Sequence, residues 1–151
     1  MSWRHVHTIR IQIRWGDMDA MGHVNNTVYF RYLEHARVEW LAAISATPNP
    51  EGEGPVIVNA HCSFIKQLTY PGEIELRTLV SPPGRSSFET RQEIRRIGAD
   101  GQVEPLICAE GGAKVVWVDF KLEKSKALPE RIRALLASSD AREGGPDISA
   151  S

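Results

Sequence analysis

The 151-residue sequence predicts one α+β domain, an antiparallel five-stranded sheet wrapped around one long central helix. Three observations predict it: a strand-like alternation near the N-terminus, a helical period of about 20 residues after it, and four β-rich segments that follow. Residues 1–137 are assigned to this domain. The small, polar segment 138–151 is expected to be a disordered tail.

The first strand is predicted at residues 7–15, where apolar and polar side chains alternate and Trp15 falls on the apolar face with three isoleucines. Residues 17–25 are rich in Gly, Asp and Asn and predict a loop. From residue 26 to about residue 46, apolar side chains recur every three or four positions. This period indicates a long amphipathic helix with Asn25 or Asn26 as its N-cap.

The rest of the chain predicts four strands in meander-like succession and a short last helix. The strands are expected at residues 56–66, 73–81, 87–97 and 106–120, and the helix at residues 129–137. A strongly twisted antiparallel sheet can bury the apolar stripe of the long helix. Its outer face and its edge still need cover, so we expect dimerisation, which the long apolar last strand also favours.

Composition excludes several classes of function. With 18 basic and 19 acidic residues the net charge is −1, so no charge excess points to nucleic acid or to a membrane surface. The N-terminus lacks the apolar core of a signal peptide, and no apolar run approaches the roughly 20 residues that span a bilayer. Cys62 and Cys108 lie in apolar strand-like runs, which favours buried reduced thiols and a cytoplasmic location.

The residues between the first strand and the long helix carry the chemistry. This segment contains two carboxylates, Asp17 and Asp19, together with His23, Asn25 and Asn26. A helix N-terminus presents unpaired N–H groups and the positive end of the helix dipole. A turn of this kind therefore brings an anionic side chain and free backbone donors to one point, which suits acyl transfer.

These motifs resemble hotdog-fold thioesterases. The resemblance covers roughly residues 7–137 and is nearest to the 4-hydroxybenzoyl-CoA thioesterase group and its small bacterial acyl-CoA thioesterases. The run His23-Val24-Asn25-Asn26 is also similar to plant acyl-carrier-protein thioesterases, although Met21 stands where those enzymes have asparagine. The signature consists of the Asp17-Met18-Asp19 pair, the run 23–26, and the helix residues Tyr29, Tyr32, Leu33, Glu34 and Arg37.

The resemblance implies that Asp19 is the catalytic carboxylate and that a backbone N–H near Asn26 donates to the developing oxyanion. It also implies a homodimer or homotetramer with active sites at the dimer interface. Asp19 would attack the thioester directly or deprotonate a water, and the sequence leaves both routes open. His23 would orient water, donate to the carbonyl or brace the loop, whereas Asp17 is expected to brace it.

Substrate contacts are predicted in two groups. The phosphates of coenzyme A need cationic and hydroxyl donors, for which Lys66, Ser86, Ser87 and Arg95 are the candidates, with Arg85, Arg91 and Arg96 nearby in sequence. The acyl pocket is expected to include Met21, Tyr29, Tyr32 and Phe64. No cofactor is expected, and no metal either, because the spacing of Asp17, Asp19 and His23 matches no standard metal site.

The sequence therefore predicts an acyl-CoA thioesterase that releases free acid and coenzyme A. Two alternatives remain at this level. In the first, the chain hydrolyses acyl groups carried by acyl carrier protein. In the second, it is a non-catalytic module that binds acyl-CoA, because a fold alone does not fix a function.

Overall fold

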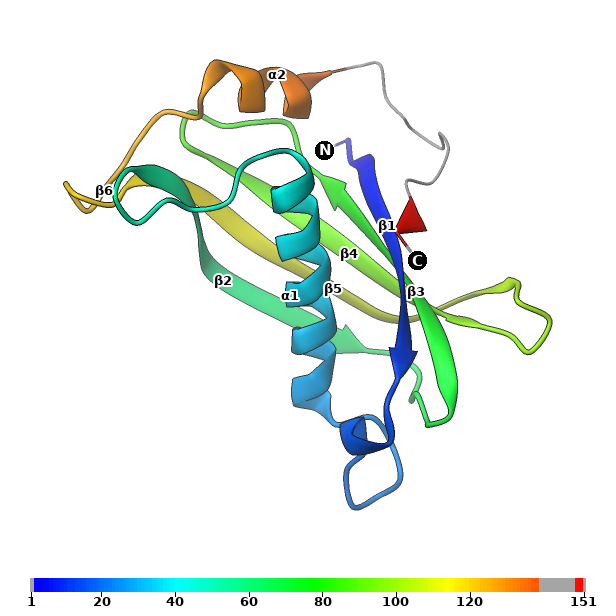
Figure 1. Cartoon of the computed structure of the whole chain (residues 1–151). Coiled ribbons are helices and arrows are strands. Elements are labelled where there is room, and N and C mark those ends of the chain that lie inside the picture. The colour runs from blue at the N-terminus through cyan, green and yellow to red at the C-terminus, as the bar shows by residue number, and fades with distance from the viewer. Residues whose placement is uncertain (1, 139–148, 151) are drawn as a thin grey trace.

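The computed structural model describes residues 2–138 and 149–150. The predicted tail falls mostly on residues 139–148 and 151, which lie outside the described residues. In chain order (Figure 1), the elements are β1 (Arg4–Ile13), the 3-10 turn η1 (Trp15–Asp17), α1 (Asn26–Ala43), β2 (Glu53–Phe64), β3 (Gly72–Val80), β4 (Ser87–Ile97), β5 (Val103–Asp119), β6 (Lys124–Ser125), α2 (Glu130–Ala137) and β7 (Ser149–Ala150).

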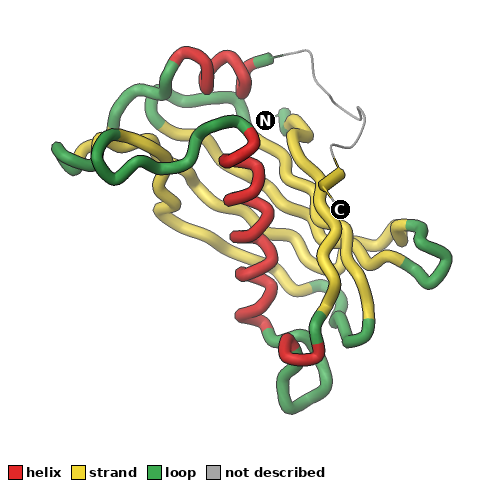
Figure 2. Tube along the Cα trace, in the orientation of Figure 1, coloured by secondary structure: helices red, strands yellow, loops and turns green. Residues whose placement is uncertain are grey.

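The helix α1 crosses one face of a single curved sheet, as Figure 2 shows, so the predicted α+β hotdog class is confirmed. The five long strands are those that the sequence predicts. Two strands of two residues each are additional: β6 pairs with β5, and β7 pairs in parallel with β1 at Thr8 and Ile9. Within the described residues, no helix is long and apolar enough to cross a membrane.

The strand order corrects the predicted meander. The order is β2-β5-β4-β3-β1-β7, so β3, β4 and β5 follow one another, but β2 pairs with β5 and not with β3. The 17-residue β5 is long enough to pair with β4 on one side and β2 on the other. An apolar pattern defines which face of a strand is buried but not which strand lies beside it. Therefore β2, and not the last long strand, forms the open edge.

The ends of β1 and α1 also differ from the prediction. β1 ends at Ile13, whose partner Gly72 is the first residue of β3, so no strand is available to pair with Trp15. Trp15 lies in η1 and is 77% exposed, contrary to its predicted place on the buried face. α1 ends at Ala43, because Ile44 is its C-cap and Ser45 adopts a positive φ of 55°.

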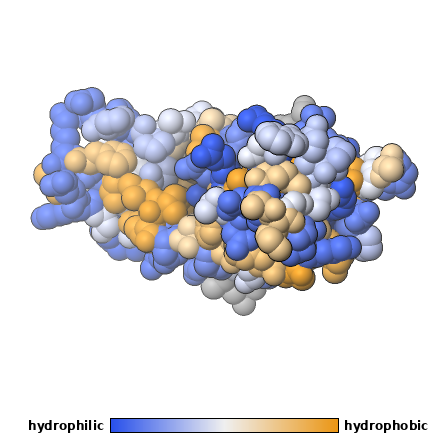
Figure 3. Space-filling model, turned by 90° about the horizontal axis from the view of Figure 1, so that it is seen from below, coloured by the Kyte–Doolittle hydropathy of each residue, from blue (hydrophilic) through white to orange (hydrophobic). Residues whose placement is uncertain are grey.

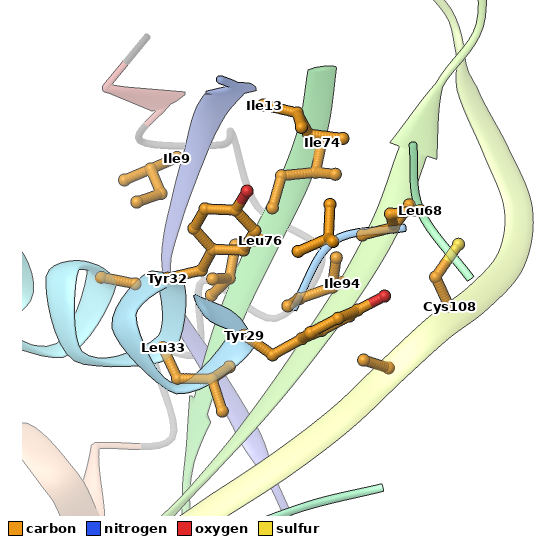
Figure 4. Packing of buried hydrophobic residues seen from close by; sticks show 13 residues of the cluster. Ile9, Ile13, Tyr29, Tyr32, Leu33, Leu68, Ile74, Leu76, Ile94 and Cys108 are labelled. Atoms are coloured by element: carbon orange, nitrogen blue, oxygen red, sulfur yellow. The ribbon is translucent and has the colours of Figure 1, made fainter. Parts of the chain in front are cut away.

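The core has two parts along α1. Its N-terminal half packs Tyr29, Tyr32 and Leu33 against Ile9, Leu76 and their neighbours on the sheet, and Figure 4 shows both tyrosine rings pointing from α1 toward the strands. Its C-terminal half packs Trp40 and Leu41 in a second cluster. That cluster also contains Phe88, Val115, Trp117, Leu128, Ile132 and Leu136.

A polar layer separates the two clusters. Arg37 is buried, although it is charged, and its Nη1 donates to the Gln92 Oε1 at 3.4 Å. The Gln92 Nε2 donates to the Leu33 carbonyl at 3.0 Å and to the Thr78 Oγ1 at 3.3 Å. Burial lowers the pKa of Arg37 from its ordinary value. The helical period did not predict this buried charge, because a periodic pattern counts apolar side chains only.

Candidate active site

Asp17 fastens the loop before α1 to the helix itself. Its Oδ2 accepts the Tyr32 hydroxyl at 2.6 Å and the Arg14 backbone N–H at 2.9 Å. Its carbonyl accepts the Asn25 N–H at 2.9 Å. These bonds give Asp17 the bracing role that the sequence predicts. They also give Tyr32 a function that the sequence did not indicate, although a buried tyrosine hydroxyl usually needs a polar partner.

Asp19 lies inside a tight loop that Met18 and Val24 close by pairing with each other. Its Oδ1 accepts backbone N–H groups from Met21 at 2.8 Å and from His23 at 3.2 Å. Gly22 has a φ of 80°, which favours glycine at this corner of the loop. Within residues 2–138 and 149–150, the Oδ2 of Asp19 has no hydrogen-bond partner. One carboxylate oxygen is therefore held and the other is free.

The first turn of α1 leaves one donor open. Asn25 is the N-cap, and its Oδ1 accepts the Thr27 N–H at 2.9 Å, while its carbonyl accepts the Val28 N–H at 2.8 Å. In the described part of the chain, the Asn26 N–H between them has no acceptor. The sequence left open which asparagine caps the helix, and the structure assigns the cap to Asn25.

Some predicted substrate residues lie at this end of the molecule. Met21 is at the loop tip and is 78% exposed. Tyr29 is buried and meets Phe64 edge to face, with ring centroids 5.0 Å apart. The exposed Lys66 follows β2 and donates its backbone N–H to the Cys108 carbonyl at 2.9 Å. Cys108 and Tyr29 belong to the same core cluster (Figure 4), so Lys66 lies near the N-terminal half of α1.

Other predicted substrate residues lie elsewhere. Ser87 pairs with Val116, and the Ser86 carbonyl accepts the Trp117 N–H, which places both serines beside the C-terminal cluster. The 18 residues of α1 span about 27 Å, so the structure does not bring these serines to Asp19 within one chain. Arg95 donates to the Glu93 carboxylate at 2.9 Å and is already paired.

The pKa shifts identify two groups near this site that stay protonated. Burial, with a hydrogen bond to the Asp17 carboxylate, raises the pKa of the Tyr32 hydroxyl, which therefore stays a donor. Burial raises the pKa of the Cys62 thiol to about 11, so it stays protonated and is a poor nucleophile. Among the described residues, no group of three His, Cys, Asp or Glu side chains is arranged to hold a metal ion.

Comparisons with known proteins agree with this geometry. The fold and the turn before α1 are consistent with a thioesterase, and the family assignment rests on the following matches. Residues 13–136 match the Thioesterase-like superfamily, and the chain belongs to that family. It is similar to the acyl-acyl carrier protein thioesterase ATL2 of Arabidopsis thaliana, with 27% identity over 131 residues, 85% of this chain and 66% of that protein.

Solved structures show the same relationship. The PA2801 protein of Pseudomonas aeruginosa, described as a candidate thioesterase, superposes with a TM-score of 0.80 at 34% identity, covering 89% of this chain and 100% of that one. A 1,4-dihydroxy-2-naphthoyl-CoA thioesterase from Synechocystis superposes with a TM-score of 0.74 over 92% of this chain and 98% of that one. Its identity is 15%, so it supports the fold alone.

Proposed function

We propose that the protein is an acyl-CoA thioesterase in which Asp19 is the reactive carboxylate and the Asn26 N–H stabilises the oxyanion. The observation that carries the proposal is the pair of free groups in one turn: the Asp19 Oδ2 and the first unpaired N–H of α1. The Oδ1 of Asp19 is held by two backbone donors, so the carboxylate is fixed before substrate binds.

Two routes fit this arrangement. In the first, Asp19 takes a proton from water, and the hydroxide adds to the thioester carbonyl carbon. The tetrahedral intermediate then breaks its C–S bond, and the departing thiolate takes the proton to give acid and coenzyme A. In the second, the Asp19 oxygen displaces the thiolate and forms a mixed anhydride, which water hydrolyses. The backbone of His23 already braces the loop, and its imidazole is proposed to orient the water.

We propose Met21, Tyr29 and Lys66 as the substrate contacts at this end, where Met21 and Lys66 are exposed and Tyr29 is buried beneath them in the core. The positions of Ser86, Ser87 and Arg95 do not support the same role within one chain. A phosphate contact by any of these three stays a prediction, as does the cytoplasmic location.

A homodimer or homotetramer completes the proposal. The open edge is β2, where residues 58–61, 63 and 64 are exposed, including Val58 at 53% and Phe64 at 42%. Seen from below, hydrophobic surface gathers on the side of the molecule where β2 lies (Figure 3). An exposed edge strand with apolar residues favours pairing with a second copy. Phe64 also contacts Tyr29, so such an interface would border the proposed acyl pocket.

The similarity to a plant acyl-acyl carrier protein thioesterase supports a second candidate substrate, acyl groups on acyl carrier protein. A parallel assay of thiol release from acyl-CoA and from acyl carrier protein with the same acyl chain separates the two. Faster hydrolysis of the CoA thioester is the expected result.

Asp19→Asn tests the proposal. We expect acyl-CoA hydrolysis to fall by at least about a hundredfold, because the amide is neither base nor nucleophile. Circular dichroism and elution volume should not change. Asp100→Asn, in the β4–β5 hairpin, is the matched control and should keep full activity. Full activity in Asp19→Asn overturns the assignment.

A further inference from the structure

A hollow lies between the open part of β1 and the side of α1. One part, of about 250 Å³, is lined by Arg14, Asp17, Arg31, Tyr32 and His35 with Ile11 and Gln12. The adjoining part, of about 530 Å³, adds Arg10, Trp15 and Tyr70. Both parts share Ile11, Gln12, Arg14 and His35, so they form one continuous depression, which we name the α1–β1 groove. β7 covers β1 only at Thr8 and Ile9, above this groove.

The groove carries excess positive charge. Arg10, Arg14 and Arg31 each line it, and across the described residues none of the three has a carboxylate within 4.0 Å. The carboxylate that lines the groove, Asp17, already accepts from the Tyr32 hydroxyl and the Arg14 N–H. Arginine is always charged and forms bidentate bonds with phosphate, so unpaired arginines favour an anionic ligand.

Other carboxylates lie beside the groove, and one of them, Glu73, is the cross-strand partner of Gln12. Glu39 contacts His7 at 3.1 Å and His35 at 3.5 Å, so its charge is directed to the histidines. Glu75 is the cross-strand partner of both Arg10 and Arg95, and it is buried within the sheet. The three arginines therefore outnumber the carboxylates that face the groove itself.

Three arginines of β4 have hydrogen-bond or ion-pair partners. Arg91 pairs with Glu110 at 2.6 Å, and Arg95 pairs with Glu93 at 2.9 Å. Arg96 donates to the Pro71 carbonyl at 3.1 Å and so fixes the turn before β3. These three side chains have partners, whereas the guanidinium groups of Arg10, Arg14 and Arg31 have none among residues 2–138 and 149–150.

Trp15 adds an aromatic surface at the rim of the groove. Its side chain is 77% exposed, so the ring is accessible to a ligand in the groove. Aromatic side chains stack on nucleic-acid bases, and every base offers a π-face. Asp17 lines the groove and is two residues from Asp19, so a ligand held here begins beside the candidate active site.

We propose that the α1–β1 groove binds the nucleotide end of coenzyme A. Arg14 and Arg31 contact its phosphates, Arg10 adds positive charge, and Trp15 stacks on the adenine. The choice of this ligand rests on the proposed function, but the binding itself does not depend on catalysis.

The test is calorimetric titration with adenosine 3′,5′-bisphosphate, which has the nucleotide and the phosphates but no thioester. We expect Arg14→Gln and Arg31→Gln each to weaken binding about tenfold, as loss of one charge-assisted contact does, and the double variant to weaken it further. Lys121→Gln is the matched control at the far end of the molecule. Arg95→Gln tests the competing phosphate contact predicted from sequence. Unchanged binding of adenosine 3′,5′-bisphosphate by Lys121→Gln and by Arg95→Gln supports the α1–β1 groove as the binding site.

Kinetics give an independent readout. In the groove variants KM for acyl-CoA should rise while kcat stays the same, and Trp15→Ala should weaken adenosine 3′,5′-bisphosphate more than inorganic pyrophosphate. Absence of nucleotide binding to the unaltered protein overturns the inference, and so does equal binding by the double variant. Recognition of acyl carrier protein without any affinity for the nucleotide overturns it as well. Nucleotide binding without thioester hydrolysis leaves the groove standing and refutes the proposed function instead.

Discussion

The two ends of α1 differ in how their unpaired backbone groups are treated. At the C-terminal end, the guanidinium of Arg131 on α2 donates to the Ile44 and Ser45 carbonyls, and α2 covers that end (Figure 1). At the N-terminal end, Asn25 accepts the backbone N–H groups of Thr27 and Val28, the second and third residues of the helix. It does not accept the N–H of Asn26, the first residue. Every helix has unpaired groups at both ends. Here Arg131 donates to the two carbonyls just after the helix, while among the described residues the Asn26 N–H has no acceptor.

The packing of the two ends differs in the same way. Trp40 and Phe88 meet edge to face at 6.0 Å in a cluster that α2 completes. The N-terminal half presents tyrosines instead, and the Tyr32 hydroxyl anchors the loop that carries Asp19. The C-terminal end is closed by apolar packing, whereas the N-terminal end carries the proposed active site. Changes at one end should therefore alter one property and not the other.

The largest expected effect is on stability at the C-terminal end. Trp40→Ala removes a side chain that is 3% exposed, and it should lower the free energy of unfolding by about 3–5 kcal/mol. Urea denaturation measures the loss, and activity per folded molecule should stay unchanged. Val38→Ala, at a position that is 60% exposed, is the control and should cost about 0.5 kcal/mol or less. Loss of activity in the folded Trp40 variant would contradict the division between the ends.

An intermediate effect is expected for Tyr32→Phe at the N-terminal end. The change deletes the 2.6 Å hydrogen bond to Asp17, which should lower stability by about 1.5–3 kcal/mol. It also releases the loop, so kcat should fall while the KM for acyl-CoA changes little. Asp17→Asn, which keeps an acceptor for the hydroxyl, should lose less activity. If Tyr32→Phe loses stability but keeps its kcat, the hydroxyl serves the fold alone.

The smallest effect concerns the rim of the C-terminal end. Hydrogen bonds from Lys126 and Trp117 lower the pKa of the Glu53 carboxyl. Because the folded state lowers this pKa, the ionised Glu53 carboxylate stabilises the fold at pH values above the ordinary pKa of glutamate. This stabilisation is lost as the pH falls through the lowered pKa. Glu53→Gln should therefore lower the free energy of unfolding by up to about 1 kcal/mol at neutral pH and leave it unchanged in acid. The loss is small because the Glu53–Lys126 pair is partly exposed. Thermal unfolding as a function of pH measures this, and a larger cost in acid than at neutral pH would contradict it.

Much of the fold was predictable because side-chain periodicity reports local structure. The alternation in β3 and β4 and the helical period of α1 each appear in the sequence, and so do the turns between them. The pairing of β2 with β5 was not predictable, because two strands far apart in the chain leave no local signal of their contact. The burial of Arg37 was missed for a related reason: Arg37 lies on α1, and its partner Gln92 lies on β4, far away in the chain.

The candidate site was predictable to a similar extent. Residue types and spacing placed Asp17, Asp19 and the asparagines in one turn. They did not indicate which oxygen of Asp19 is held, nor that the Tyr32 hydroxyl reaches Asp17. They also favoured Arg95 as a phosphate contact, and they gave no sign that Arg14 and Arg31 line one groove, because a strand end and a helix side meet only in the folded chain.

The sequence by itself determined the hotdog class, the position of the turn before α1 and the thioesterase family, since each depends on local pattern or residue identity. Only the tertiary structure decided the β2 edge, the free oxygen of Asp19, the unpaired Asn26 N–H and the cationic α1–β1 groove. These features depend on which groups find partners. Partners are distributed by contacts between segments that are distant in the chain, and a linear pattern does not record them.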